Sequence, residues 1–328
     1  MKILAMSNKE RWNKYIDDPV FLSQHEVTFV PFNSDEETVL KAGGDAEILL
    51  ADAVAGVSGD IIRKMKNLKM IHSEGVGFNA IDVKTATELG IYVCNCRAMN
   101  ASAVAEQAVL LMLGLLRSVV SCDKAVREGR QIGVKLAYMD AGSLRELADC
   151  RIGFVGLGAV GKATAKICNA MGAELVYYDK FLLSEEQEAE YNIKHLSLDE
   201  LIRTSDIVSL HVPVTDETKH MVNKEFLGKM KEGSYLINTA RGDLTVAEDL
   251  LDALKNGPLA GAGLDCLEGE PVTIDNPMLK ADAETAAKIL YSPHIGGITA
   301  SSFRRGYGMI REDIEALVRG EKPKYCVN

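Results

Sequence analysis

The chain has 328 residues, and at about 150 residues per domain this length favours two domains over one. Hydrophobic residues make up 47% and charged residues 26% of the chain, which is typical of globular proteins. The formal net charge of −10 excludes a basic surface for nucleic acid or for an anionic membrane. No apolar run reaches the roughly 18 residues of a membrane span, and the first residues lack a signal-peptide core. We therefore expect a cytoplasmic protein that binds neither nucleic acid nor membranes.

The seven cysteines form an odd set without a CxxC pair, so we expect reduced thiols. Cys94 and Cys96 resemble half of a zinc site. No second pair of Cys or His follows at the spacing that a zinc site needs, so the sequence predicts no metal site.

Short runs rich in Val, Ile and Leu alternate with helix-period segments along the whole chain. This alternation predicts the α/β class, with doubly wound parallel sheets covered by helices on both faces. In the first third, helices are expected near 60–65 and 82–89, and strands at 2–7, 26–32, 46–52, 69–75 and 91–95.

Residues 101–127 form a long apolar-periodic segment without Pro, which predicts one helix that bridges or crosses domains. The Gly-containing stretch 129–143 is expected to be irregular.

After that stretch the strand and helix alternation restarts. Strands are expected at 151–155, 174–179, 206–212, 233–238, 260–265 and 288–294, with helices beginning near 160, 197, 224 and 246. An amphipathic helix at 299–319 follows the last strand, and we expect it to return to the first domain. The predicted organisation is a first domain of 1–100 plus 299–328 with a second domain, 101–298, inserted.

A GxGxxG motif from Gly156 to Gly161 directly follows the strand 151–155 and precedes a helix. Gly156 makes the tight turn, Gly158 lets the backbone approach a pyrophosphate, and Gly161 allows close packing of helix on strand. The helix N-terminus, beginning with Ala159 and Val160, offers free N–H donors to an anion. This position in a strand–turn–helix unit predicts a dinucleotide site.

Asp179 ends the next strand, where a carboxylate accepts hydrogen bonds from the adenosine ribose and repels a 2′-phosphate. We therefore favour NAD over NADP. NADP stays an alternative because of Lys180, whose positive charge could partly balance the 2′-phosphate of NADP.

Three polar side chains follow three successive strands of the second domain: Arg241, Glu270 and His294. Since the carboxyl ends of parallel strands meet at one edge of a sheet, we expect the three to lie close together. An Arg offers a fork for a carboxylate, and a His beside a Glu offers a proton donor. The alternative is a surface Arg–Glu pair with a His packed beside Pro293.

Successive motifs resemble those of the D-isomer-specific 2-hydroxyacid dehydrogenases, in the right order over most of the chain. They are VGLGAVG with Asp179, LHVPVT at 210–215, INTARGD at 237–243, GLDCLEGEP at 263–271 and SPHIGG at 292–297, with similar features at 73–77 and 104–106. The resemblance implies a Rossmann NAD-binding domain inserted in a flavodoxin-like substrate domain. It also implies a homodimer built through the nucleotide domains, with the 101–127 segment involved.

The resemblance makes Arg241, Glu270 and His294 the catalytic residues, and the family spacing selects Glu270 over its neighbour Glu268. It implies that NAD is bound by Gly156, Gly158, Ala159, Val160, Gly161, Asp179, Val212, Pro213, Thr218, Thr239, Ala240, Arg241, Asp265, His294 and Gly296. The substrate, a small 2-oxo or 2-hydroxy acid, would be bound by Arg241 and by the loop residues Gly75, Val76 and Gly77.

These side chains imply a mechanism. Arg241 binds the substrate carboxylate with two parallel N–H donors and polarises the C2 oxygen. His294 gives that oxygen a proton during reduction, and Glu270 orients the ring and favours its protonated form. Asp265 holds the nicotinamide carboxamide, and hydride moves between C4 of nicotinamide and C2 of the acid.

Two stretches depart from the family pattern. Arg97 stands where many members carry Pro, so it either faces the pocket and favours a second anionic group or is a solvated loop residue. Residues 280–287 lengthen the segment before the last strand, and we interpret them as a surface elaboration.

Two function classes remain. The first is an NAD-dependent (R)-2-hydroxyacid dehydrogenase of the 2-oxoacid reductase, phosphoglycerate or glyoxylate/hydroxypyruvate type; formate dehydrogenases share the fold but lack the catalytic Glu. The second is an NAD-sensing module similar to the C-terminal-binding-protein corepressors. Turnover of 2-oxo acids with NADH separates the two classes.

Overall fold

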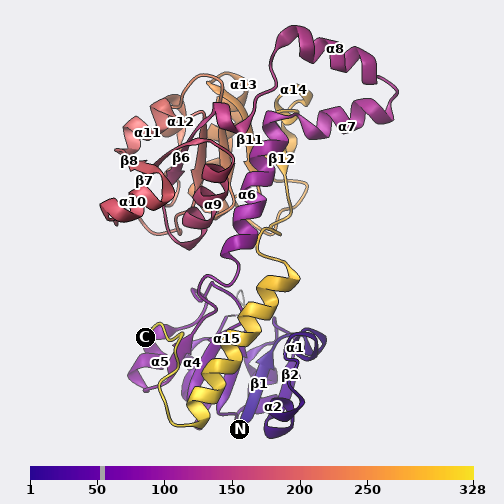
Figure 1. Cartoon of the computed structure of the whole chain (residues 1–328). Helices are drawn as coiled ribbons and strands as arrows, with labels where there is room; N and C mark the ends of the chain where they lie inside the picture. Colours follow the sequence, from indigo (N-terminus) through magenta and orange to yellow (C-terminus); the bar gives the residue numbers. More distant parts are fainter. Residues whose placement is uncertain (52–55) are drawn as a thin grey trace. The chain divides into compact units, whose positions relative to one another are not determined.

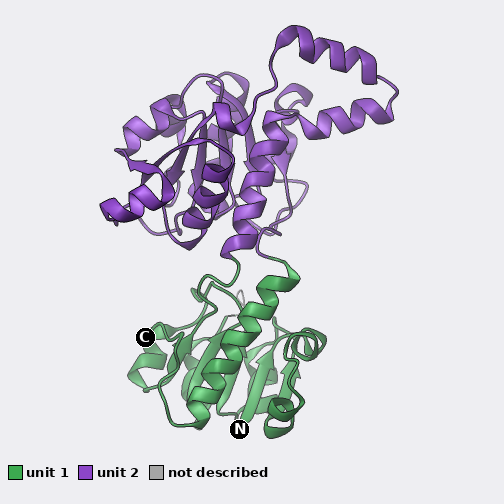
Figure 2. Cartoon of the chain, viewed as in Figure 1, with its two compact units in different colours: residues 1–100, 298–328 green, residues 101–297 purple. Residues whose placement is uncertain are grey.

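The computed structural model describes residues 1–51 and 56–328, which divide into two compact units (Figures 1 and 2). Unit 1 comprises the described part of residues 1–100 together with 298–328, and unit 2 comprises 101–297. The strand predicted at 46–52 is present, but its last predicted residue, Asp52, lies outside the described residues.

The described residues of unit 1 form a five-stranded sheet in the order β2-β1-β3-β4-β5, and all its pairings are parallel. Its strands are β1 (Lys2–Met6), β2 (Glu26–Val30), β3 (Ile48–Ala51), β4 (Met70–Ser73) and β5 (Tyr92–Cys94). Its helices are α1 (Lys9–Tyr15), α2 (Pro19–Gln24), α3 (Glu36–Gly43), α4 (Gly59–Lys64), α5 (Val83–Glu88) and α15 (Ala300–Val318).

Alternate residues of each strand in unit 1 face opposite cores, which is why the strands read as continuous apolar runs. In β1, Leu4 and Met6 pack under α3, α4 and α5, whereas Ile3 and Ala5 pack under α1, α2 and α15. Helix α15 contributes Tyr307, Ile310 and Ile314 to this second core, so the last amphipathic helix packs on unit 1.

The described residues of unit 2 form a seven-stranded sheet in the order β12-β11-β10-β9-β6-β7-β8, again with parallel pairings throughout. Its strands are β6 (Arg151–Val155), β7 (Glu174–Tyr178), β8 (Ile193–His195), β9 (Ile207–Leu210), β10 (Ser234–Asn238), β11 (Leu259–Leu264) and β12 (Ile289–Tyr291). The two parallel sheets confirm the predicted fold class.

Helices cover both faces of the sheet in unit 2. Helices α6 and α9 share one core with Ile152 and Phe154, and α11, α12 and α13 share the other with Val155. The α-helices of unit 2 are α6 (Ala101–Leu116), α7 (Val119–Arg127), α8 (Gln131–Ala141), α9 (Ala159–Ala170), α10 (Glu185–Tyr191), α11 (Leu198–Thr204), α12 (Lys224–Gly228), α13 (Ala247–Lys255) and α14 (Ala283–Ala286). Short 3₁₀ turns are η1 (Leu147–Asp149), η2 (Gly242–Leu244) and η3 (Pro277–Lys280).

The prediction of one helix over 101–127 is wrong, because Ser118 adopts a left-handed conformation (φ +49°) and separates α6 from α7. Helix α6 packs on α9 and on β10, β11 and β12, so it belongs to the core of unit 2 and does not bridge domains. Taken alone, none of the described helices is long and apolar enough to cross a membrane; only α6 and α7 together, bent by 59°, meet that test.

The prediction of an irregular stretch at 129–143 is also wrong, since α8 occupies 131–141. Helices α7 and α8 pack on each other and project from the rest of unit 2 as a hairpin (Figure 1). The predicted surface elaboration at 280–287 contains the short helix α14.

Candidate active site

The glycine motif occupies the turn between β6 and α9. Gly156 has a φ of +94°, and its N–H donates to the carbonyl oxygen of Tyr178 at 2.8 Å. A Cβ at this position would lie 2.7 Å from Val212 and 2.8 Å from the carbonyl oxygen of His211. Only glycine therefore fits this turn without strain.

The two other glycines of the motif play different structural roles. A Cβ at Gly161 would lie 2.5 Å from the carbonyl oxygen of Gly156, so its absence permits the close approach of α9 to β6. Gly158 precedes α9, and a Cβ added at Gly158 would meet no atom within 4 Å. The backbone at the start of this 12-residue helix is thus open to an anionic group.

The Asp179 carboxylate is fixed against this turn. Its Oδ2 accepts the N–H of Leu157 at 2.6 Å, and its Oδ1 accepts the N–H of Phe181 at 2.9 Å. Lys180 forms an ion pair with Glu217 on the loop after β9. The Glu217 carboxylate therefore neutralises the Lys180 charge that could have bound the 2′-phosphate of NADP. This arrangement fits NAD, which has no 2′-phosphate.

The loop after β9 carries Val212, Pro213 and Thr218. The Thr218 hydroxyl donates to the carbonyl oxygen of Pro213 at 2.6 Å and accepts the N–H of Thr215 at 2.8 Å, which fixes the loop beside the glycine turn. At the end of β10, the buried Thr239 hydroxyl has no hydrogen-bond partner among the described residues. A buried polar atom in this position fits a site that a polar ligand completes.

His211, although it lies beside the glycine turn, is unsuited to acid–base work. It is partly buried, with its Nδ1 shielded from solvent, and it stacks on Phe154 and contacts the Ser209 hydroxyl at 2.9 Å. Burial lowers the pKa of His211 to about 4, so its ring is neutral at neutral pH.

The turn that carries Arg241 is shaped by Asn238, a residue that the sequence analysis did not single out. The Asn238 Oδ1 accepts the N–H of Ala240 at 3.0 Å, and its Nδ2 donates to the carbonyl oxygen of Arg241 at 2.8 Å. The Arg241 guanidinium is exposed and donates to the carbonyl oxygen of Ala240 at 2.6 Å. Asn238 belongs to the INTARGD motif, and an Asn directly before a turn is the sequence signal that could have predicted this role.

Strands β10, β11 and β12 are neighbours, so the loops after them meet at one edge of the sheet. A Cβ at Gly242 would collide with the carbonyl group of Leu267, which means that the Arg241 turn touches the backbone of the loop that carries Glu270. The sheet order and this glycine bring the two loops together.

Glu270 and His294 form a direct pair. The Glu270 Oε2 lies 2.5 Å from the His294 Nδ1, and the Glu270 Oε1 accepts the N–H of Leu267 at 2.8 Å. Glu268, the rival acid, instead lies 2.6 Å from the Nε2 of His220 and accepts the N–H of Ala247. The structure therefore gives His294 the carboxylate partner that the family spacing selects. With Nδ1 held by Glu270, Nε2 is the ring nitrogen that can exchange a proton.

Asp265 holds the turn that carries His294. Its Oδ1 accepts the N–H of Ile295 at 3.0 Å and the Ser292 hydroxyl, and its Oδ2 accepts the N–H of Gly296 at 2.9 Å. Gln107 on α6 donates to the Ser292 hydroxyl at 2.9 Å. This structural role was not predicted from the sequence, because no local pattern pairs residues so far apart in the chain.

The predicted substrate loop, Gly75 to Gly77, lies in unit 1, whereas the other predicted site residues lie in unit 2. The Ser73 hydroxyl donates to the carbonyl oxygen of Gly77 at 2.6 Å, and the Asn95 amide donates to that of Val76 at 2.7 Å. Arg97 is exposed on the loop after β5. In the described parts of the chain, no three His, Cys, Asp or Glu residues are grouped so that they could hold a metal ion.

Comparison with known proteins adds to this geometry. Residues 109–296 match the NAD binding domain of the D-isomer specific 2-hydroxyacid dehydrogenases. The glyoxylate reductase of Thermofilum pendens is 37% identical over 292 residues, which cover 89% of this chain and 84% of that protein. The hydroxypyruvate reductase of Thermotoga maritima is 32% identical over 304 residues, which cover 90% of this chain and 94% of that protein.

A solved structure of a D-lactate dehydrogenase has a similar fold. The D-lactate dehydrogenase of Aquifex aeolicus, complexed with NAD and lactic acid, matches with a TM-score of 0.81 and 27% identity. The match covers 98% of this chain and 96% of that one. These relatives are enzymes, and they lend no support to the alternative of an NAD-sensing corepressor.

Proposed function

Because this chain belongs to the D-isomer-specific 2-hydroxyacid dehydrogenase family and is an NAD-dependent oxidoreductase, we propose that it reduces small 2-oxo acids, with glyoxylate and hydroxypyruvate as its best substrates. The contact of 2.5 Å between Glu270 and His294 carries this proposal, since it places an oriented acid–base group at the sheet edge that also holds Arg241. The names of the two relatives, glyoxylate reductase and hydroxypyruvate reductase, support the choice of substrates.

NADH, when bound, would supply the hydride that C2 of the oxo acid accepts, and it would leave as NAD. The turn from Gly156 to Gly161 would hold its pyrophosphate, and Asp179 would hold the adenosine ribose. The Thr239 hydroxyl, buried and unpaired among the described residues, would gain a polar partner from it.

Arg241 binds and polarises the substrate. The planar guanidinium presents parallel N–H donors, which match the two oxygens of a carboxylate. Its positive charge also stabilises the negative charge that develops on the C2 oxygen as hydride arrives at C2.

His294 moves the proton. During reduction its Nε2–H donates to the C2 oxygen, and during oxidation the neutral ring takes the proton back. Glu270 fixes the tautomer and the orientation of the ring through Nδ1.

A substrate panel tests the proposal. Initial rates with NADH are measured at the nicotinamide absorbance band for glyoxylate, hydroxypyruvate, pyruvate and 3-phosphohydroxypyruvate. We expect the highest kcat/KM with glyoxylate or hydroxypyruvate, and the His294→Ala variant serves as the matched control for background reduction. A preference for 3-phosphohydroxypyruvate would overturn the proposed substrates, and an inactive wild-type chain would overturn the proposed activity.

We also propose that two copies of the chain associate through the α7–α8 hairpin. The hairpin leaves several apolar side chains exposed, Val126 at 58%, Ile132 at 64% and Met139 at 66% among them. A cavity of about 410 Å³ lies between its helices and is lined mainly by apolar side chains. Because the family resemblance implies a dimer built through the nucleotide domains, a second copy of the chain is the proposed occupant of this surface.

A further inference from the structure

Residues 325–328 run along the free edge of β5 in unit 1. The N–H of Asn95 donates to the carbonyl oxygen of Tyr325 at 3.2 Å, and the N–H of Val327 donates to that of Val93 at 2.8 Å. Between these two hydrogen bonds, Cys94 and Cys326 face each other in an antiparallel bridge.

The register brings the two cysteines close. Both hydrogen bonds flank the Cys94–Cys326 pair and neither is made by it, so this is a non-hydrogen-bonded antiparallel pair. The Cα atoms of such pairs lie about 4.5 Å apart, with their side chains on the same face of the sheet. That separation falls within the roughly 4.4–6.8 Å that a disulfide spans.

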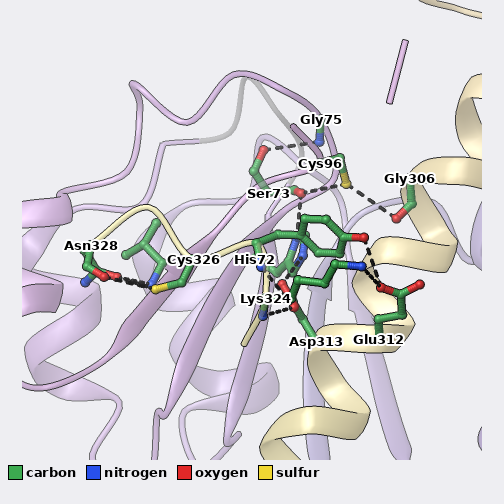
Figure 3. A network of polar contacts seen from close by, with 12 residues as sticks. His72, Ser73, Gly75, Cys96, Gly306, Glu312, Asp313, Lys324, Cys326 and Asn328 are labelled. Atoms are coloured by element: carbon green, nitrogen blue, oxygen red, sulfur yellow. Dashed lines mark hydrogen bonds and ion pairs between the residues drawn. The ribbon is translucent and has the colours of Figure 1, made fainter. Parts of the chain in front are cut away.

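The two thiols also share one environment. Cys94 is completely buried, and Cys326 is partly buried against the same core, which lies between the sheet and α15. Burial, the Asp313 carboxylate and the Cys326 thiol together raise the pKa of the Cys94 thiol. Figure 3 shows Cys326 beside Asn328, to whose carbonyl and side-chain oxygens its thiol donates at 3.2 Å.

We propose that Cys94 and Cys326 form a redox-active pair, which a peroxide converts into a disulfide that fastens residues 325–328 to β5. The two differ in access: Cys326 is partly exposed and Cys94 is not. Cys326 therefore reacts first, taking one oxygen atom from the peroxide to become a sulfenic acid, with release of water. The Cys94 thiol then attacks that sulfur, the S–S bond forms, and the sulfenic oxygen leaves as a second water with the Cys94 proton.

The disulfide would add a covalent link between two elements that hydrogen bonds already hold together. The segment is held to α15 by Asp313, whose Oδ1 accepts the N–H groups of Lys324 at 2.7 Å and Tyr325 at 3.2 Å (Figure 3). The end of β5 in turn holds the loop at Gly75, since the N–H of Cys96 donates to the Gly75 carbonyl oxygen at 2.9 Å. A covalent link at this point removes the opening motion that would separate the segment from the sheet.

Peptide mapping of the full chain tests the pair. Reduced protein is treated with hydrogen peroxide, digested without reductant and analysed by mass spectrometry. We expect a peptide containing Cys94 linked to one containing Cys326, and a fall from seven free thiols to five in the denatured protein. We also expect the melting temperature to rise by about 5 °C and to return to its starting value with dithiothreitol.

Two variants complete the design. Cys326→Ser changes a partly exposed residue and should abolish both the link and the rise in melting temperature. Cys122→Ser, on α7 in unit 2, should leave both intact. The proposal is overturned if Cys326 is oxidised to a sulfinic acid while Cys94 stays a free thiol, or if the link forms without raising the melting temperature.

Discussion

At the scale of single residues, Arg241 is positioned by backbone contacts. Asn238 fixes its turn, and the guanidinium donates to the carbonyl oxygen of Ala240, a weaker partner than a carboxylate. The arginine can therefore exchange this contact for a substrate carboxylate at little cost.

Replacing Arg241 by Lys should lower kcat/KM for glyoxylate about ten- to a hundredfold. A Lys cannot present the bidentate fork, so one charge-assisted hydrogen bond of about 1.5–3 kcal/mol is lost. Steady-state kinetics with NADH measure the effect, with Arg203→Lys on α11 as a control for the same exchange elsewhere in unit 2. Unchanged kinetics would mean that the carboxylate binds elsewhere, and Arg97 would be the next residue to test.

His294 and Glu270 should behave as one unit. The His294→Ala variant should lose about 10²–10⁴-fold in turnover, because it lacks the proton donor. The Glu270→Gln variant should also lose turnover, because a neutral amide holds the His294 ring less firmly than the carboxylate does. The double variant should be little worse than His294→Ala alone. Strictly multiplicative losses in the double variant would show that Glu270 acts independently.

Cofactor preference should depend on the carboxylates around Lys180. Asp179 and Glu217 should together favour NADH over NADPH at least tenfold, which corresponds to about 1.4 kcal/mol. Glu217→Gln leaves the Lys180 charge uncompensated, so kcat/KM with NADPH should rise while that with NADH stays nearly constant. Asp216→Asn is the neighbouring control. Equal use of both cofactors by the wild-type chain would contradict this account.

The residue types at the site could be predicted because each motif follows a strand at a fixed spacing. Arg241, Glu270 and His294 were found in this way. The contacts that position these residues could not be predicted. Gln107, for example, donates a hydrogen bond to Ser292, which lies 185 positions later in the chain. Long-range hydrogen bonds of this kind leave no periodic or local signal in a sequence.

At the scale of elements, α15 contacts the sheet of unit 1 through a buried histidine and a buried aspartate. The Nε2 of His72 on β4 lies 3.3 Å from the Oδ2 of Asp313 on α15, and both side chains are fully buried. Burial alone would raise the pKa of Asp313, but His72 and the N–H groups of Lys324 and Tyr325 hold it below its usual value. The carboxylate therefore stabilises the fold at neutral pH, and this contribution is lost as the pH falls through that lowered pKa.

The Asp313→Asn variant should be less stable than the wild-type chain by about 1–3 kcal/mol at pH 7. The difference should shrink as the pH falls below about 4, where the unfolded-state carboxyl takes up its proton. Denaturant unfolding at several pH values measures this, and Asp140→Asn, on the exposed face of α8, is the matched control. A difference that does not change with pH would show that the charge of Asp313 contributes nothing.

The elements with strong patterns were predicted well, and the weak ones were not. The buried strands of both sheets were found from their apolar runs, but β8 was missed because only Ile193 of its three residues is buried. The break at Ser118 was missed because serine carries no strong preference for a left-handed conformation. Helix α8 was missed because none of its residues is buried, so no apolar stripe marks it.

At the scale of the whole molecule, the exposed hairpin should decide the oligomeric state. Replacing Leu136 and Met139 together by Glu puts two charges on the apolar surface of α8 and should convert dimer to monomer. Light scattering after size exclusion measures the mass. The matched control is Val318→Glu, which charges an exposed apolar residue of α15 in unit 1. A wild-type chain that runs as a monomer at micromolar concentration would contradict the proposed dimer.

Unit 1 is assembled from two segments of the chain, and this has a consequence for biosynthesis. When a ribosome has made residues 1–100, Tyr307, Ile310 and Ile314 of α15 do not yet exist, so α1 and α2 alone cover that face of the sheet and part of its apolar surface is exposed. Unit 2, which is continuous in sequence, can complete its core before α15 emerges. The core of unit 1 therefore stays incomplete while nearly 200 further residues are synthesised. A chain released from a ribosome that stalls in that interval would expose apolar residues of the sheet and would tend to aggregate.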